Sequence, residues 1–238
     1  MSATSSPWQH DVEYPCSDGE RIAESGHQLR PLFYSIESLR ARFRSRKDVY
    51  VSGNSFLYYE KGNPTARVAP DVFVVIGADN HLRDTYLLWN EPKGPDFVLE
   101  ITSRSTRIRD QGTKRGLYQY LGVTEYFCFD PTFDYLVPPL RGYRLHNGRY
   151  EPITPSIETP AHVVVESQTL GLSLQLLDGV FRFSDPQTGL VLPSYDEVLK
   201  QLAELKAARQ QAEAQTRELE AEIAALSGGN GNGKTSGS

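Results

Sequence analysis

The sequence predicts an α/β (α+β) fold in which a central mixed sheet is flanked by helices and followed by a β-rich C-terminal half. Between residues 30 and 130, runs typical of strands and of helices alternate, and this order favours a mixed sheet with at least one crossover connection. Between residues 140 and 184, short strand-like runs follow one another with hairpin-type turns. After residue 193 the composition shifts to Ala, Glu, Gln, Lys, Arg and Leu, which indicates a long C-terminal helix.

Composition and charge exclude several classes of protein. The chain has 238 residues, of which 39% are hydrophobic and 23% charged, so it can bury one sizeable core. No apolar run approaches the ~18 residues of a membrane span, and the N-terminus lacks the features of a signal peptide, so we expect a soluble, cytoplasmic protein with no membrane partner. The two cysteines, Cys16 and Cys128, predict neither a disulfide framework nor a cysteine zinc site. The net charge of -5 argues against tight nonspecific binding of nucleic acid.

We expect four segments along the chain. Residues 1–17 form an N-terminal arm, and residues 18–192 form the main domain. Residues 193–227 form the C-terminal helix. Residues 228–238 are too rich in glycine and polar side chains to order, so we expect a disordered tail.

The first predicted elements are one helix and three strands. From about residue 30 to Phe43, apolar side chains recur at spacings of three and four, which predicts an amphipathic helix with a basic outer face. The run "DVYVSGNSFLYYEKGNP" predicts two strands joined by a hairpin at its Gly-Asn pair. The run "ARVAPDVFVVIG" predicts a third strand.

A crossover helix and a series of strands follow. The run "PDFVLEIT" predicts a fourth strand, and the next run predicts a helix that begins near Ser105 or Thr106 and ends before Gly122. "TEYFCFDP" predicts the next strand. Further strands are predicted in "LRGYRLHNGRYEPI", "HVVVES", "LGLSLQLLDG" and "VFRFSDP", with turns at "HNG" and "LDG".

The C-terminal helix carries a heptad pattern typical of a coiled coil. Its seam positions alternate spacings of four and three, although polar side chains interrupt the middle of the seam. Two interpretations remain open: a surface helix that packs on its own domain, or a helix through which the chain forms a homo-oligomer. The seam consists of Val198, Leu202, Leu205, Arg209, Ala212, Thr216, Leu219, Ile223 and Leu226.

Glu100 lies in the middle of an apolar strand, where a carboxylate requires a hydrogen-bond donor, a cation or a metal. Alternation along the strand places Asp96, Glu100 and Thr102 on one face and the intervening apolar residues on the other. Asp71 stands at the entrance of the preceding predicted strand. Its carboxylate can meet that of Glu100 if the two strands are neighbours.

Lys114 supplies a third polar group. It shares one helical stripe with Leu117, Tyr118 and Leu121, and its flexible stem can carry the ammonium to a polar pocket at the edge of the core. Two carboxylates and a lysine over a sheet suit a Mg²⁺ site, because Mg²⁺ is held by a few acidic oxygens and keeps waters for a reaction. Phosphodiester hydrolysis is the natural candidate reaction.

Each of these residues also has a structural interpretation. Asp71 can be a strand-entry residue, and Asp96 can be a turn residue. Lys114 and Asp110 are spaced as an ordinary helix ion pair, which stabilises a helix by ~0.2–0.5 kcal/mol. Glu100 can pair with an arginine from the run "SRSTRIR".

The runs "VAPDVFVVIG" and "PDFVLEITSRSTRIRDQGTKRGLYQYLGVTEYFCFDP" resemble the Uma2 family, also called DUF820, whose members are named as restriction endonucleases. The resemblance extends from about residue 18 to about residue 190. It implies a restriction-endonuclease-like PD-(D/E)XK core, with metal carboxylates at the ends of strands of the central mixed sheet.

The resemblance also implies roles for individual residues. Asp71 supplies the first acid, and Glu100 supplies the acid of the second half of the motif. Where the standard motif has a lysine, this chain has Thr102, and Lys114 on the following helix fits the place of a migrated lysine. Glu24 matches a further acid that some members of the fold add from the first helix.

These observations give two hypotheses from different classes. In the first, the chain is a Mg²⁺-dependent endonuclease that hydrolyses phosphodiester bonds in DNA, and Mn²⁺ can replace Mg²⁺. Asp71 and Glu100 bind the metal, and Lys114 is the catalytic amine. Further candidates for the site are Glu24, Asp96 and Thr102. In the second, it is a non-catalytic scaffold or binding protein that keeps the nuclease fold and oligomerises through its C-terminal helix. The acidic net charge and the threonine at position 102 favour the second.

Overall fold

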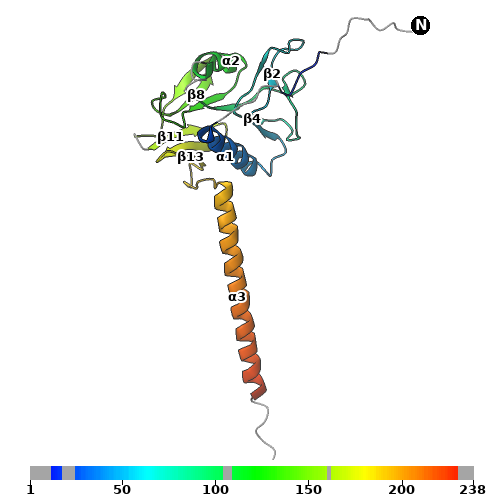
Figure 1. Ribbon diagram of the computed structural model, residues 1–238, viewed down its shortest axis with the longest axis vertical. Coiled ribbons are helices and arrows are strands. Elements are labelled where there is room, and N and C mark those ends of the chain that lie inside the picture. The colour runs from blue at the N-terminus through cyan, green and yellow to red at the C-terminus, as the bar shows by residue number, and fades with distance from the viewer. Residues whose placement is uncertain (1–11, 18–24, 104–108, 160–161, 230–238) are drawn as a thin grey trace, which may run out of the picture. The chain divides into compact units, whose positions relative to one another are not determined.

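The computed structural model describes residues 12–17, 25–103, 109–159 and 162–229, and the chain divides into two compact units between Leu192 and Pro193. The first unit is built on a six-stranded sheet (Figure 1). Its strands, in spatial order, are β1 (Val49–Ser52), β4 (Val72–Ile76), β6 (Phe97–Ile101), β7 (Glu125–Phe129), β8 (Leu140–His146) and β9 (Arg149–Ile153). Since β6 and β7 run parallel and the other neighbours antiparallel, the predicted mixed sheet is confirmed.

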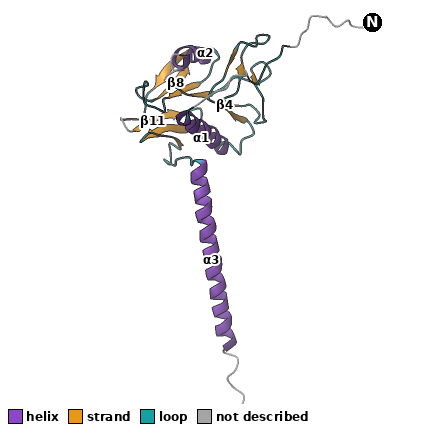
Figure 2. Cartoon of the chain, viewed as in Figure 1, coloured by secondary structure: helices purple, strands orange, loops and turns teal. Residues whose placement is uncertain are grey.

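Two smaller sheets complete the first unit, and strands outnumber helices in it (Figure 2). One sheet contains β10 (Ile157–Glu158), β11 (His162–Ser167), β12 (Leu172–Leu177) and β13 (Val180–Ser184). The other contains β3 (Arg67–Val68), β2 (Leu57–Tyr58) and β5 (Tyr86–Leu87). The predicted β-rich half is therefore confirmed. Its hairpin turns at Asn147-Gly148 and Asp178-Gly179 have positive φ at both residues, as type I′ turns require.

The six-stranded sheet separates two hydrophobic cores. Alternation along β6 sends Phe97 and Leu99 into the first core, beneath α1 (Gly26–Arg42) and the four-stranded sheet. Val98 enters the second core, which is rich in tyrosine. Glu100 lies on the same side of β6 as Val98, as the alternation predicts. One face of β6 therefore packs in the first core, whereas the other face carries Glu100 into the second core.

The first helix begins earlier than expected. Its N-cap is Ser25, which forms a capping box with Gln28, and the helix runs through Pro31. Pro31 removes one helical hydrogen bond but does not end the helix. The helix begins at the capping box, which lies before the first residue of the apolar pattern. Glu24 lies outside the described residues.

The predicted hairpin after the first helix is wrong, because β1 and β2 belong to different sheets. The chain turns at Asn54, whose φ is 49° and whose N–H donates to the Pro70 carbonyl. Gly53 packs so closely on the Asp71 backbone that a Cβ would lie 2.1 Å from its carbonyl oxygen. The predicted third strand is also divided, into β3 and β4, because Pro70 cannot donate to a ladder.

The crossover from β6 to β7 contains η1 (Arg109–Lys114), a π-helical turn, and α2 (Arg115–Tyr120). The predicted start of this helix at Ser105 or Thr106 lies outside the described residues. Its end is confirmed, because Gly122 has a φ of 76° just past α2. The Arg115 guanidinium lies 5.2 Å from the ring centroid of Tyr143, so α2 sits beside β8 (Figure 1). Helices thus cover both faces of the central sheet.

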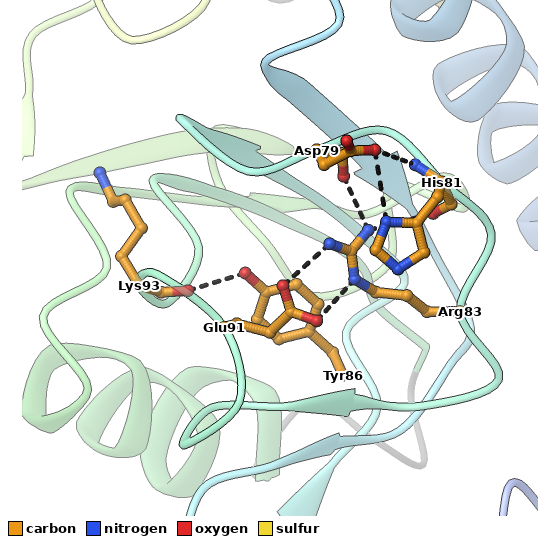
Figure 3. A network of polar contacts seen from close by, with 6 residues as sticks. All are labelled: Asp79, His81, Arg83, Tyr86, Glu91 and Lys93. Carbon is orange, nitrogen blue, oxygen red and sulfur yellow. Dashed lines mark hydrogen bonds and ion pairs between the residues drawn. The ribbon is translucent and has the colours of Figure 1, made fainter.

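The connection between β4 and β6 is held by a buried arginine (Figure 3). Arg83 donates two hydrogen bonds to Glu91, at 2.7 and 2.8 Å, and its guanidinium lies 4.4 Å from the Tyr50 ring centroid. It also donates to the backbone carbonyls of Asp79 and His81. Charge-assisted bonds of this bidentate kind fix geometry as well as energy, so the chain enters β6 along a defined path.

The second unit contains α3 (Tyr195–Gly229), a helix of 35 residues. Its ends differ by two residues from the predicted 193–227, which is the ordinary uncertainty of helix boundaries. The side chains described in α3, at positions 195–225, are all exposed. Among the helices of the described ranges, none is long and apolar enough to span a bilayer.

Candidate functional site

The pairing of β4 with β6 brings Asp71 beside Glu100. The register sets Val72 opposite Leu99, and one further step places Asp71 opposite Glu100 on the face of the second core. Side chains directly opposite each other in an antiparallel pair have Cβ atoms about 4.5–5.5 Å apart. The backbone N–H of Ile101 donates to Asp71 Oδ2 at 2.7 Å, which fastens this carboxylate to the end of β6.

Glu100 is completely buried and has partners on both carboxylate oxygens. Lys114 Nζ donates to Oε2 at 2.8 Å, and the Tyr118 hydroxyl donates to Oε1 at 2.6 Å. Such partners are what a carboxylate in a low-dielectric core requires. The arrangement gives the carboxylate one fixed orientation.

The crossover helix delivers both donors. Lys114 ends η1 and Tyr118 lies four residues later in α2, so the two side chains project from one stripe. Leu117 and Leu121 of the same stripe pack against the second core. The predicted core-facing stripe is thus confirmed, and Lys114 is 9% exposed.

Lys114 also ties the helix to the strand that carries Asp71. Its Nζ lies 3.4 Å from the carbonyl oxygen of Ala69, two residues before Asp71. Asp71 itself is half-buried, so the group has one fully enclosed acid and one acid nearer to solvent. The structure therefore brings Asp71, Glu100 and Lys114 to one end of two neighbouring strands.

The other candidate residues lie in different surroundings. Thr102 is buried, and its hydroxyl lies 2.5 Å from the Tyr135 hydroxyl and donates to the Phe129 carbonyl, which links β6 to β7 and to the loop after it. Asp96 precedes β6 at its opposite end, about 13 Å from Glu100 along the strand. There it accepts the Ile76 N–H at 2.7 Å and pairs with Lys93. The structure does not bring Asp96 to the other two acids.

Two phenols beside the group differ in what they contact. The ring of Tyr126 lies 5.4 Å from that of Tyr118, and its hydroxyl accepts a hydrogen bond from Cys128. Burial, and then the neighbouring Cys128 and Glu100, raise the pKa of Tyr126 well above its ordinary value. This phenol therefore stays neutral. Tyr118 is not among the site residues that the sequence predicts, although its spacing of four residues from Lys114 is the signal that identifies it as a partner of Glu100.

The donor set fits a divalent ion of the Mg²⁺ type. Mg²⁺ is usually held by one or two carboxylates and completed by waters and substrate phosphates, and Asp71 and Glu100 supply two carboxylates on one face. A carboxylate offers about four acceptor positions, so a hydrogen bond and a metal bond to one group are compatible. Within the described ranges, no three or more His, Cys, Asp or Glu side chains gather around a possible metal position.

Comparisons with known proteins identify the family of the chain. A sequence model of the Uma2 family, described as "Putative restriction endonuclease", matches residues 7–177. A solved structure from Anabaena variabilis, titled a "putative nuclease belonging to DUF820", is similar over 63% of this chain and 77% of that chain, at 12% sequence identity and a TM-score of 0.46. A search of curated proteins found no match. The family match spans the strands of Asp71 and Glu100 and the helix of Lys114.

Proposed function

The chain belongs to the Uma2 family, and from that premise we propose that it is a Mg²⁺-dependent endonuclease that hydrolyses phosphodiester bonds in DNA. The observation that carries the proposal is the buried Glu100 carboxylate, which accepts from the Lys114 ammonium and lies opposite Asp71 in the pairing of β4 with β6. A buried ionisable group with a specific charge partner is a candidate for a functional site. Cytoplasmic location remains a prediction of the sequence.

In this proposal Asp71 and Glu100 hold the ion, and Mn²⁺ can replace Mg²⁺. A bound ion of this kind lowers the pKa of a coordinated water and neutralises charge on a phosphate. Lys114 carries a positive charge at the same strand end, where it stabilises the charge that develops on the phosphate oxygens. Tyr118 fixes the orientation of Glu100 through its hydrogen bond to Oε1.

The test is cleavage of DNA by the full-length protein in Mg²⁺ or Mn²⁺, with Glu100→Gln as the decisive variant. We expect Glu100→Gln to lower cleavage at least about a hundredfold, because it removes a metal ligand. Glu125→Gln is the matched control, since Glu125 is also fully buried but faces the opposite side of the sheet. Cleavage that survives Glu100→Gln would remove this residue from the mechanism. Parallel assays on single-stranded DNA and on RNA define the substrate.

The second candidate is a non-catalytic scaffold or binding protein that oligomerises through α3. The threonine at position 102, the net charge of -5 and the exposed apolar residues of α3 favour it. Mn²⁺ titration distinguishes the two candidates, because an ion that binds only the native state raises the melting temperature. A melting temperature that does not respond to Mn²⁺, together with the absence of cleavage, would favour the scaffold.

A further inference from the structure

The α3 helix exposes an apolar seam that has a regular spacing. The side chains of Leu202, Leu205, Leu219 and Ile223 are between 45% and 68% exposed and occupy seam positions of the heptad pattern. Most helical stability in proteins comes from tertiary packing of such a face. A seam with a 3.5-residue repeat is completed by another helix with the same repeat.

A second copy of the chain supplies the matching helix. Within the described residues the other helices are α1, with 17 residues that already pack on the first core, and η1 and α2, with 6 residues each. We propose that α3 pairs with α3 of a second copy in an antiparallel coiled coil. This inference does not depend on the proposed nuclease activity, and it adds a partner and a sense of pairing to the oligomerisation of the second candidate.

A parallel pairing in register is unfavourable. Each seam residue would then face its own copy, so Arg209 would meet Arg209 and two further weak layers, Ala212 and Thr216, would follow directly. The flanking positions would not compensate, since they would pair no opposite charges. The flanking pairs would be Gln201 with Lys206, Ala208 with Glu213, and Gln215 with Glu220.

An antiparallel pairing avoids the contact between the two Arg209 side chains and places opposite charges at flanking positions. Reversal sets Arg209 opposite Ala212 of the second copy, where its long aliphatic stem has room. The large apolar residues at the two ends of the seam then meet one another. The remaining layers are Val198 with Ile223, Leu202 with Leu219, and Leu205 with Thr216, and each occurs twice by symmetry.

Charge complementarity also favours the antiparallel sense. In this register Lys206 of one copy flanks Glu213 of the other, again twice by symmetry. Arg209 Nε lies 2.7 Å from Glu213 Oε1 within one helix, so Glu213 already sits beside the seam. Flanking charges of this kind set the orientation of coiled-coil partners.

Sedimentation equilibrium and disulfide trapping test the pairing in the full-length protein. In a Cys16→Ser background, Leu202→Cys and Leu219→Cys are placed on separate chains with tags of different length. We expect a concentration-dependent dimer and a mixed disulfide between the two chains, but none between two Leu202→Cys chains. In a parallel pair, positions 202 and 219 would be about 25 Å apart. A wild-type monomer, a Leu202→Cys homodimer or the absence of any cross-link would overturn the proposal.

A charge reversal gives a second measurement on an exposed side chain, which does not disturb folding. Lys206→Glu should weaken the dimer about tenfold, because two attractive contacts with Glu213 become repulsive. Adding Glu213→Lys should restore the dimer. In a parallel pair Lys206 would face the neutral Gln201, so an unchanged dissociation constant in Lys206→Glu would contradict the antiparallel arrangement.

Discussion

Glu100 and Glu125 are both completely buried, on neighbouring strands, but they face opposite sides of the central sheet. Glu125 accepts hydrogen bonds from the Arg144 guanidinium at 2.9 Å and from the Ser167 hydroxyl at 2.5 Å. The backbone N–H groups of Gln168 and Thr169 also donate to it. These partners join β7 to β8 and to the turn that links β11 and β12.

The surroundings of Glu100 are of a different kind. Glu100 accepts hydrogen bonds from one ammonium and one phenol, both from a single short stretch of helix, and Asp71 lies opposite it on the neighbouring strand. Glu125 thus accepts from backbone N–H groups as well as from side chains, whereas Glu100 accepts from two side chains of the crossover helix, one of them the fully buried Tyr118. Burial alone therefore does not distinguish the two carboxylates, but Glu100 lies opposite a second acid, Asp71, on the neighbouring strand.

Removal of the cation should have the largest effect and should separate the two regions. Lys114→Met removes the ammonium that pairs with the enclosed Glu100, and we expect a loss of about 3–5 kcal/mol in the free energy of unfolding. Arg144→Met leaves Glu125 with three donors, so we expect a loss of about 1–2 kcal/mol. Urea unfolding measures the free energy of unfolding of both variants. The double variant Lys114→Met with Glu100→Gln should recover part of the lost stability but no cleavage activity. Equal losses of stability in Lys114→Met and Arg144→Met would contradict the expected difference between Glu100 and Glu125.

Neutralising each glutamate should separate stability from metal binding. Glu125→Gln replaces an acceptor oxygen by an amide donor among four donors, and we expect it to cost about 2–4 kcal/mol while Mn²⁺ affinity stays within about twofold. Glu100→Gln should weaken Mn²⁺ binding at least about a hundredfold. Calorimetric titration with Mn²⁺ gives both affinities. A similar loss of affinity in the two variants would contradict a local site at Glu100.

A substitution at Gly53 tests whether the position of Asp71, just before β4, matters for metal binding. Gly53→Ala places a Cβ 2.1 Å from the Asp71 carbonyl oxygen, so we expect a loss of about 1–3 kcal/mol and weaker Mn²⁺ binding, because the backbone of Asp71 must shift. Gly116→Ala is the control: no atom lies within 4 Å of the added Cβ, and a helical alanine should stabilise the protein by about 0.5–1 kcal/mol. Unfolding and Mn²⁺ titration of both variants check this. Unchanged Mn²⁺ affinity in Gly53→Ala would separate Asp71 from the site.

The smallest change removes one hydroxyl from the surroundings of Glu100. Tyr118→Phe should cost about 1 kcal/mol of stability and weaken Mn²⁺ binding about tenfold, because it removes the donor that orients Glu100. Tyr86→Phe is the matched control, since this buried hydroxyl donates to the Lys93 carbonyl at 2.7 Å. It should cost similar stability and leave Mn²⁺ affinity unchanged. Equal affinities in the two variants would make Tyr118 a packing residue.

Local patterns predicted the parts of the site that depend on local geometry. Alternation along β6 placed Glu100 on the face opposite Phe97 and Leu99, and helical spacing placed Lys114 on the core-facing stripe. Both follow from the backbone repeat of one element, so a single sequence suffices. The partner of Glu100 then follows, because the stripe lies over the strand.

Features that depend on contacts between distant segments were not predicted. The Gly-Asn pair at residues 53–54 has the composition of a hairpin turn, but the close contact of Gly53 with Asp71 directs the chain into another sheet. The role of Glu125 depends on donors more than 40 residues later in the chain. Tyr118 lies on an apolar stripe, and the sequence does not show whether the hydroxyl of such a tyrosine has a hydrogen-bond partner.

The most direct measurement is the position of Mn²⁺ in crystals of the full-length protein, located by its anomalous scattering. We expect one ion in contact with carboxylate oxygens of both Asp71 and Glu100, at about 2.1 Å, with Lys114 beside it. In crystals of Glu100→Gln that peak should disappear. An ion bound elsewhere, or density at saturating Mn²⁺ that leaves both carboxylates without a metal, would contradict the proposed site.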